Sequence, residues 1–161
     1  METNQAFVAS ATRSWQQVVT RIGKHCSTLS EDQLLTEVSP GKNRIIYLWG
    51  HLTAIHDAMI PLLGFGERLH PQLESVFVSH PDRSLSLPNS GEIKKFWEEI
   101  HAELSSRFLT LTPNEWLQRH SNVSPEDFKL DPTRNRLAIL LGRTNHASYH
   151  LGQMMLAQKK D

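Results

Sequence analysis

Hydrophobic side chains recur at intervals of three and four residues in four long segments of the chain, the spacing with which one face of an α-helix is buried. The pattern predicts a first helix over residues 4–29, a second over 43–63, a third from Asn89 to about 111, and a fourth over 133–159. No segment alternates convincingly between hydrophobic and polar residues. The pattern therefore predicts an all-α protein.

The expected buried faces follow from the same spacing. Asn89 or Ser90 is the expected N-cap of the third helix, and Asp131 or Thr133 that of the fourth. The face of the first helix is expected to contain Phe7, Val8, Ala11, Trp15, Val18, Val19 and Ile22. The face of the fourth is expected to contain Leu137, Leu140, Leu141, Thr144, Ala147, Ser148, Leu151 and Met155.

A long connection, residues 65–89, separates the second and third predicted helices. It contains three prolines and several serines, and its apolar residues indicate that it packs against the rest of the chain. There are no internal repeats and no low-complexity tracts. We therefore expect a single domain over residues 1–161, a four-helix bundle with a long crossover connection between helices two and three.

Charge and cysteine content exclude several classes of function. Lysine plus arginine and aspartate plus glutamate both number 17, so no excess of positive charge favours nucleic acid or a membrane surface. A single cysteine, Cys26, rules out an internal disulfide framework and fits a reducing compartment. Neither a signal peptide nor a long apolar run is present. We therefore expect a cytoplasmic protein without nucleic-acid or membrane partners.

The fourth predicted helix carries the candidate chemistry. His146 and His150 are four residues apart, so they lie one turn apart on one face, the spacing with which a helix offers two imidazoles to one metal ion. His51 lies one turn from Leu48 and Ile55 and should point inward with them. The residues alone leave the alternative open that these histidines are polar residues at the edge of an apolar stripe.

Other histidines fit a metal site less well. His56 follows His51 by five residues, about 140° around the helix, so we expect it at the surface or supporting the site from behind. Glu98 and His101 have the spacing of a di-iron ligand pair, but no second helix repeats it, and we expect His101 to be solvated.

Two segments resemble a known family. Trp49-Gly50-His51-Leu52 in the second helix and Asn145-His146-Ala147-Ser148-Tyr149-His150-Leu151-Gly152-Gln153 in the fourth resemble the DinB/YfiT-like family of metal-binding four-helix bundles. The resemblance covers nearly the whole chain. It implies that His51, His146 and His150 are the ligands of one divalent transition-metal ion, such as zinc, nickel or iron. It also implies a homodimer.

Three neighbours of the histidine pair have two interpretations each. Gln153 is placed to hydrogen-bond a ligand histidine or a neighbouring helix, or to be satisfied by backbone. Arg143, one turn before His146, is placed either to meet an anionic substrate or to be solvated. Tyr149 borders the pair as a packing or surface residue. No catalytic residue is assigned.

The resemblance implies that the metal binds and activates a low-molecular-weight thiol, as in an S-transferase. The same metal ion would also lower the pKa of bound water, which would make the protein a hydrolase instead. The alternative is a non-catalytic dimeric bundle, a stress-response or binding protein in which the metal site is weak or vestigial. An open cleft beside the histidines would favour catalysis, and a site sealed by apolar side chains would favour the alternative.

Overall fold

The computed structural model describes residues 3–157, and all regular structure among them is helical. The four long helices are α1 (Thr3–Thr28), α3 (Ile45–Asp57), α6 (Ser90–Phe108) and α9 (Arg136–Leu156). The short helices are α2 (Glu31–Leu34), α4 (Met59–Leu62), α5 (Leu73–Phe77), α7 (Pro113–Trp116) and α8 (Pro125–Leu130). The predicted all-α bundle with a crossover between its second and third long helices is confirmed.

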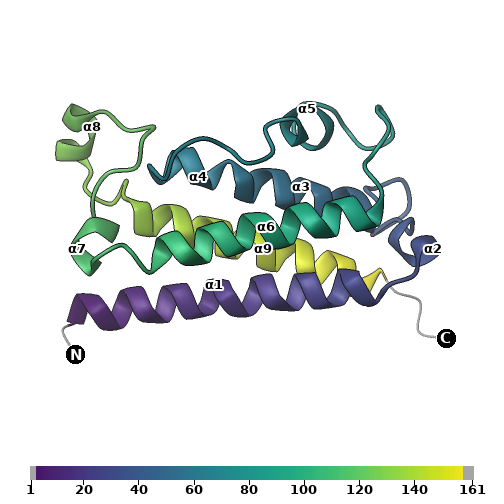
Figure 1. The fold of residues 1–161 in the computed structure, drawn as a ribbon, viewed down its shortest axis with the longest axis horizontal. Coiled ribbons are helices and arrows are strands. Elements are labelled where there is room, and N and C mark those ends of the chain that lie inside the picture. The colour runs from purple at the N-terminus through teal and green to yellow at the C-terminus, as the bar shows by residue number, and fades with distance from the viewer. Residues whose placement is uncertain (1–2, 158–161) are drawn as a thin grey trace.

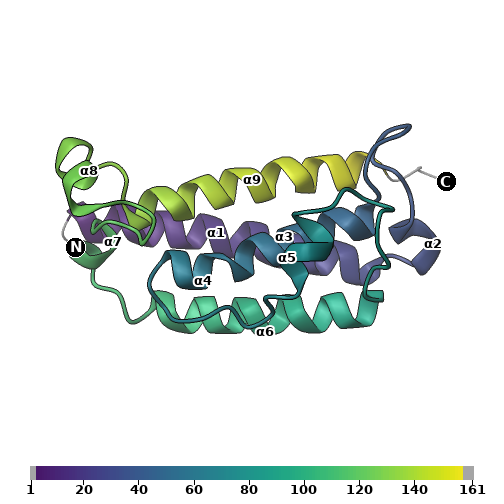
Figure 2. The same cartoon turned by 90° about the horizontal axis from the view of Figure 1, so that it is seen from above.

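The long helices lie side by side along the longest axis of the molecule (Figure 1). Helices α1 and α9 run in one direction, and α3 and α6 run in the other, so α3 is antiparallel to α9 (Figures 1 and 2). The crossover between α3 and α6 passes over the outside of α3 and contains α5 (Figure 2). Helices α7 and α8 lie together at one end of the bundle.

The core is formed by the inward faces of the long helices and by aromatic side chains of the shorter ones. Large side chains that are fully buried include Trp15, Trp49, Phe77 and Trp116. Four residues expected on buried faces are instead exposed, because the buried stripes of α1 and α9 are narrower than the spacing suggests. These residues are Phe7, Leu141, Ser148 and Met155.

The second long helix does not run unbroken to residue 63. It ends at Asp57, and after Ala58 the short helix α4 begins. Pro61 lies inside α4, and proline has no N–H to donate to the carbonyl four residues earlier, which here belongs to Asp57. The break therefore lies one turn before the proline.

The last helix begins later than predicted. Its N-cap is Asn135, whose side chain accepts a hydrogen bond from the backbone N–H of Ala138. Asp131 instead accepts hydrogen bonds from the backbone and hydroxyl of Thr133, which forms a turn before the helix. The prediction of Asp131 or Thr133 as cap was wrong. The predicted C-terminal end, Lys159, lies outside the described residues.

Polar side chains fasten the crossover to the bundle. Arg44 pairs with Asp82 at 2.6 Å, and the Asp82 side chain is almost fully buried. Asp57, at the end of α3, accepts hydrogen bonds from the backbone N–H groups of Leu69 and His70. These contacts fix the crossover, and hence α5, against the outside of α3. Within residues 3–157, no helix is both long enough and apolar enough to cross a membrane.

Candidate metal centre

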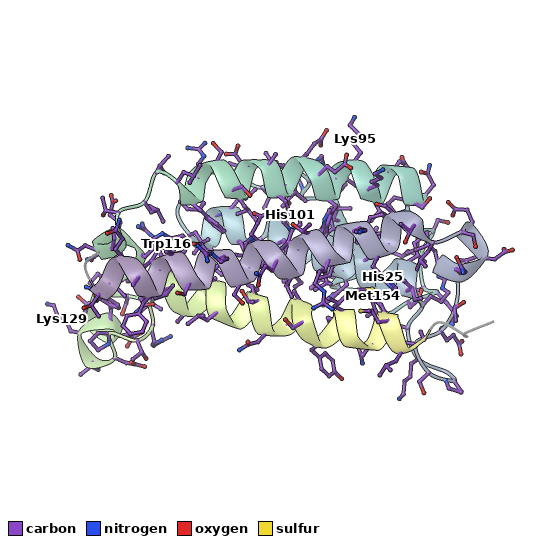
Figure 3. All side chains as sticks on the ribbon, turned by 90° about the horizontal axis from the view of Figure 1, so that it is seen from below. His25, Lys95, His101, Trp116, Lys129 and Met154 are labelled. Carbon is purple, nitrogen blue, oxygen red and sulfur yellow. The ribbon has the colours of Figure 1, made fainter. Side chains whose placement is uncertain are left out.

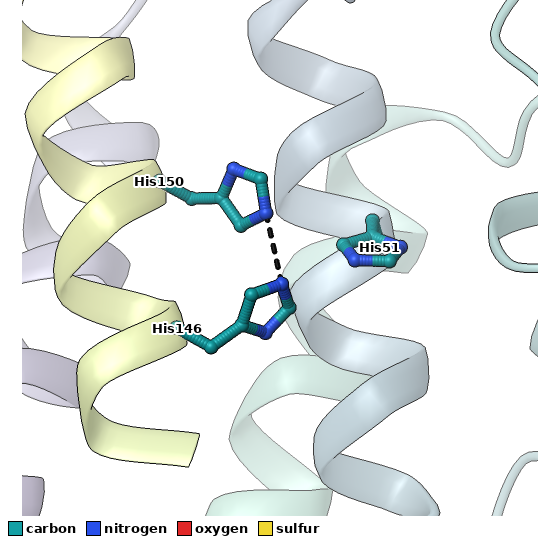
Figure 4. A group of neighbouring side chains, drawn as sticks. All are labelled: His51, His146 and His150. Atoms are coloured by element: carbon teal, nitrogen blue, oxygen red, sulfur yellow. Dashed lines mark hydrogen bonds between the residues drawn. The ribbon is translucent and has the colours of Figure 1, made fainter. Parts of the chain in front are cut away.

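Three histidines from two antiparallel helices meet near the middle of the bundle. His51 comes from α3, and His146 and His150 come from successive turns of α9 (Figure 4). The His51 ring centroid lies 5.3 Å from that of His146 and 5.5 Å from that of His150. One nitrogen from each residue can be chosen so that all three lie within 4.8 Å of one another. The structure thus brings together the three residues that the sequence singled out.

Hydrogen bonds orient two of the three rings. The Nδ1–H of His51 donates to the backbone carbonyl of Phe77 at 2.8 Å, and the Nδ1–H of His150 donates to Oε1 of Gln153 at 2.8 Å. A neutral imidazole that donates from Nδ1 has its lone pair on Nε2, the atom through which it would bind a metal. His146 lies with its Nε2 only 3.0 Å from Nε2 of His150 (Figure 4).

The environment keeps the α9 pair uncharged at neutral pH. Burial, reinforced by the nearby charges of His150, His51 and Arg143, lowers the pKa of His146 to about 4. Burial also lowers the pKa of His150, an effect that the hydrogen bond to Gln153 opposes. Metal ions bind the neutral form of imidazole. The donor set therefore fits a divalent transition-metal ion, because three imidazole nitrogens converge and hydrogen bonds hold two of the rings in the correct tautomer.

A cleft of about 510 Å³ opens beside the histidines. His150 lines it from α9, and residues of the loop before α3 also line it. Its lining residues are Val38, Ser39, Gly41, Lys42, Asn43, Leu48, Tyr149, His150 and Gln153. The three histidines are each only half-buried. The group is therefore not sealed by apolar side chains.

Three neighbours of the α9 histidine pair differ in where they lie relative to it. Gln153 accepts from His150 and donates from Nε2 to the hydroxyl of Tyr149 at 3.1 Å, so it contacts a candidate ligand directly. Tyr149 is largely exposed and lines the cleft. Arg143 is half-buried, one turn from His146, and does not line the cleft of His150.

Two histidines lie deeper than the sequence suggested. His56 was expected at the surface or behind the site, and His101 was expected in solvent, but both are buried. Nδ1 of His56 lies 2.9 Å from Nε2 of His101, and the centroid of the His101 ring lies 4.0 Å from that of Trp97, with the two rings tilted by 48°. Figure 3 shows His101 between α6 and α1, on the inner side of α6. Burial places the pKa of His101 at about 4, and burial with neighbouring positive charge holds that of His56 far below 6.5.

No spacing or motif in the sequence indicates this pair. The two residues lie 45 positions apart, and their burial depends on Trp15, whose ring centroid lies 4.5 Å from that of His56. The role of Phe77 was not predicted either. Its backbone carbonyl orients His51, and the position of that carbonyl depends on the path of the crossover. Cys26 is buried in the core, and burial raises its pKa to about 12.

Comparison with known protein families decides what kind of protein this is. The family model described as the DinB superfamily matches residues 14–154, most of the chain. The chain belongs to the DinB superfamily. No match was found among curated proteins. The matched residues of this DinB-superfamily chain include His51, His146 and His150, a group that could hold a metal ion.

Proposed function

We propose that His51, His146 and His150 bind one divalent transition-metal ion, such as zinc, nickel or iron, and that the protein is a metal-dependent enzyme. The observation that carries this proposal is the convergence of three imidazole nitrogens within 4.8 Å of one another. Within residues 3–157, no further histidine, cysteine or carboxylate joins the group. Three protein ligands leave room for an exogenous ligand, the pattern of catalytic metal sites.

The substrate side of the proposal rests on the cleft. A volume of about 510 Å³ is sufficient for a small molecule, and the cleft reaches His150 directly. Lys42 is the one charged residue that lines the cleft, so the cleft suits a small molecule with a carboxylate. Tyr149 and Gln153 offer hydrogen bonds at the same wall.

We infer that the cleft takes a low-molecular-weight thiol and that the protein is of the S-transferase type. A bound divalent ion would lower the pKa of a coordinated thiol and so supply a thiolate nucleophile. The protein would contribute the three imidazoles, the hydrogen bonds that orient them and Lys42 to hold the substrate. Activation of water by the same site, which would make the protein a hydrolase, is the second possibility.

Cobalt substitution distinguishes these possibilities. Co²⁺ bound to the protein is titrated with cysteine, which carries a carboxylate, and with 2-mercaptoethanol, which does not. A thiolate-to-cobalt charge-transfer band in the near ultraviolet, appearing at lower concentrations of cysteine than of 2-mercaptoethanol, is the expected result. The Lys42→Gln variant should lose the preference for cysteine and keep the band.

Two outcomes would contradict parts of this proposal. Cobalt binding without any thiolate band would exclude thiol activation and favour water. No binding of cobalt, zinc or nickel would leave the non-catalytic bundle as the better account.

We also propose a homodimer, with the exposed apolar side chains of α9 in its interface, among them Leu141 and Leu156. Sedimentation velocity measures the oligomeric state, and a monomer at micromolar concentration would contradict it.

A further inference from the structure

The buried pair His56–His101 has a fixed arrangement of protons. Nδ1 of His101 lies 2.6 Å from the backbone carbonyl of Trp97, which can only accept, so His101 donates from Nδ1. Its Nε2 therefore accepts the hydrogen bond from Nδ1–H of His56 at 2.9 Å. As a result, Nε2 of His56 is the ring nitrogen of these two histidines that still has a free lone pair. That residue is fully buried.

This Nε2 atom and one polar atom of each of two residues whose charges act on His56 are buried and have no hydrogen-bond partner among residues 3–157. They are Nε2 of His56, Nε of Arg143 and Nδ1 of His146. The guanidinium Nε–H of Arg143 is a donor, and Nε2 of His56 is an acceptor. Burying a polar atom without a partner is unfavourable, so these atoms indicate that a ligand satisfies them.

The antiparallel packing of α3 and α9 places these residues at one level. His51 lies opposite the midpoint of His146 and His150, since its ring is almost equidistant from both of theirs. His56 is five residues further along α3, and Arg143 is five residues back along α9 from that midpoint. At about 1.5 Å per residue, both positions lie about 7.5 Å from the level of His51, toward the same end of the bundle.

We propose that His56, Arg143 and His146 enclose a binding site for one buried water molecule, which links a candidate metal ligand to the His56–His101 pair. The water accepts the Nε–H of Arg143 and donates to Nε2 of His56. Its contact with Nδ1 of His146 completes about three hydrogen bonds, the usual number for a buried water.

Water fits this position because it can both donate to His146 and accept from it. Since His150 donates from Nδ1 to Gln153, the hydrogen between the two Nε2 atoms of the pair belongs to His146, whose Nδ1 is then an acceptor. With a metal ion on Nε2 of His146, Nδ1 carries the proton and becomes a donor. A water molecule accommodates both arrangements with one rotation, whereas a side chain that only donates or only accepts fits one of them.

The proposed water would orient His146, the third candidate ligand. His51 donates to Phe77 and His150 donates to Gln153, and the water gives His146 the acceptor that it otherwise lacks. His56 is then a positioning residue that acts on His146 through the water. This consequence rests on the proposed metal site, but the water site itself does not.

Two measurements test the inference. A crystal structure of the metal-free protein at better than about 1.5 Å resolution should show an ordered water within hydrogen-bond distance of Nε2 of His56, Nε of Arg143 and Nδ1 of His146. Direct contact between His56 and Arg143, or apolar packing around Nε2 of His56, would overturn the site whether or not the protein binds metal.

The second measurement is zinc affinity by chelator competition in two variants and a control. His56→Gln keeps an acceptor and should bind zinc within a few-fold of the unaltered protein, whereas His56→Leu should bind at least about 10-fold more weakly. His120→Leu, a substitution in the α7–α8 connection, should change nothing. Equal affinities of His56→Gln and His56→Leu, both folded by circular dichroism, would overturn the link to His146.

Discussion

At the scale of single residues, the candidate ligands differ in what orients them. His51 is held by a backbone carbonyl, and His150 is held by an amide side chain that also contacts Tyr149. A carbonyl of the chain cannot be removed by substitution, but the amide of Gln153 can. Substitution of Gln153 can therefore test how much a hydrogen-bond acceptor on a candidate ligand contributes to metal binding.

Substitution of Gln153 by leucine should weaken zinc binding by about 10-fold or more, because His150 loses the acceptor that fixes its Nδ1–H tautomer. Gln153→Glu offers a stronger acceptor and should bind at least as tightly as the unaltered protein. Chelator competition measures both affinities. If the leucine variant bound zinc as tightly as the glutamate variant, Gln153 would not support the site.

At the scale of elements, α5 connects the crossover to the candidate metal centre. The backbone of Gly50 leaves space for the Phe77 ring, since a Cβ added there would lie 2.1 Å from a ring carbon. The same Phe77 accepts the hydrogen bond of His51 through its carbonyl. Gly50 therefore lets α5 approach α3 closely enough to orient a ligand of the site.

Gly50→Ala should consequently lower the free energy of unfolding by about 1–3 kcal/mol, because Phe77 must move to make room for the methyl group. Zinc affinity should fall with it, since Phe77 also carries the acceptor for His51. Urea unfolding and chelator competition measure the two effects.

Gly142→Ala is the matched control on α9. A Cβ there meets nothing within 4 Å, so the change should stabilise the helix by about 0.5–1 kcal/mol and leave zinc affinity unchanged. Gly50→Ala with unaltered stability would contradict the close packing of α5 on α3.

The elements also show what the sequence could predict. The spacing of His146 and His150, and of His51 with Leu48 and Ile55, indicated three inward-facing candidates, because positions on one helix face follow from helical geometry alone. Their grouping as the ligands of one metal ion was implied by the resemblance to the DinB/YfiT-like family. The break at Ala58 was not predicted, because the proline that causes it lies three residues later.

Contacts between distant segments were the main gap. The hydrogen bond of His56 to His101 and the acceptor at Phe77 depend on how three helices and the crossover pack. No spacing within one segment encodes such contacts. Exposed residues of α9 such as Leu141 were expected inside for a similar reason, since the width of a buried stripe depends on how the neighbouring helices pack.

At the scale of the whole molecule, the buried uncharged histidines make stability depend on pH. His101 has a pKa of about 4 in the folded protein against 6.5 for a free side chain, because burial disfavours its charged form. Below pH 6.5 the unfolded chain takes up a proton that the folded protein does not. The contribution of His101 to stability is therefore constant above about pH 7 and decreases as the pH falls toward 4.

For the metal-free protein, the free energy of unfolding should fall between pH 7 and pH 4, with a contribution from His101 of about 3 kcal/mol. Urea unfolding at several pH values, with chelator present, measures the slope. In His101→Leu the slope should be shallower by about one proton, provided that the variant folds. A variant slope equal to that of the unaltered protein would show that His101 is not held neutral by burial.

The central claim is that His51, His146 and His150 bind one metal ion, and metal content tests it most directly. Protein purified without a histidine tag, then incubated with zinc and desalted, is compared with His51→Ala and with His120→Ala by elemental analysis. We expect about one zinc ion per chain in the unaltered protein and in His120→Ala, and none in His51→Ala at unchanged helical content. Equal zinc content in His51→Ala and the unaltered protein would contradict the account.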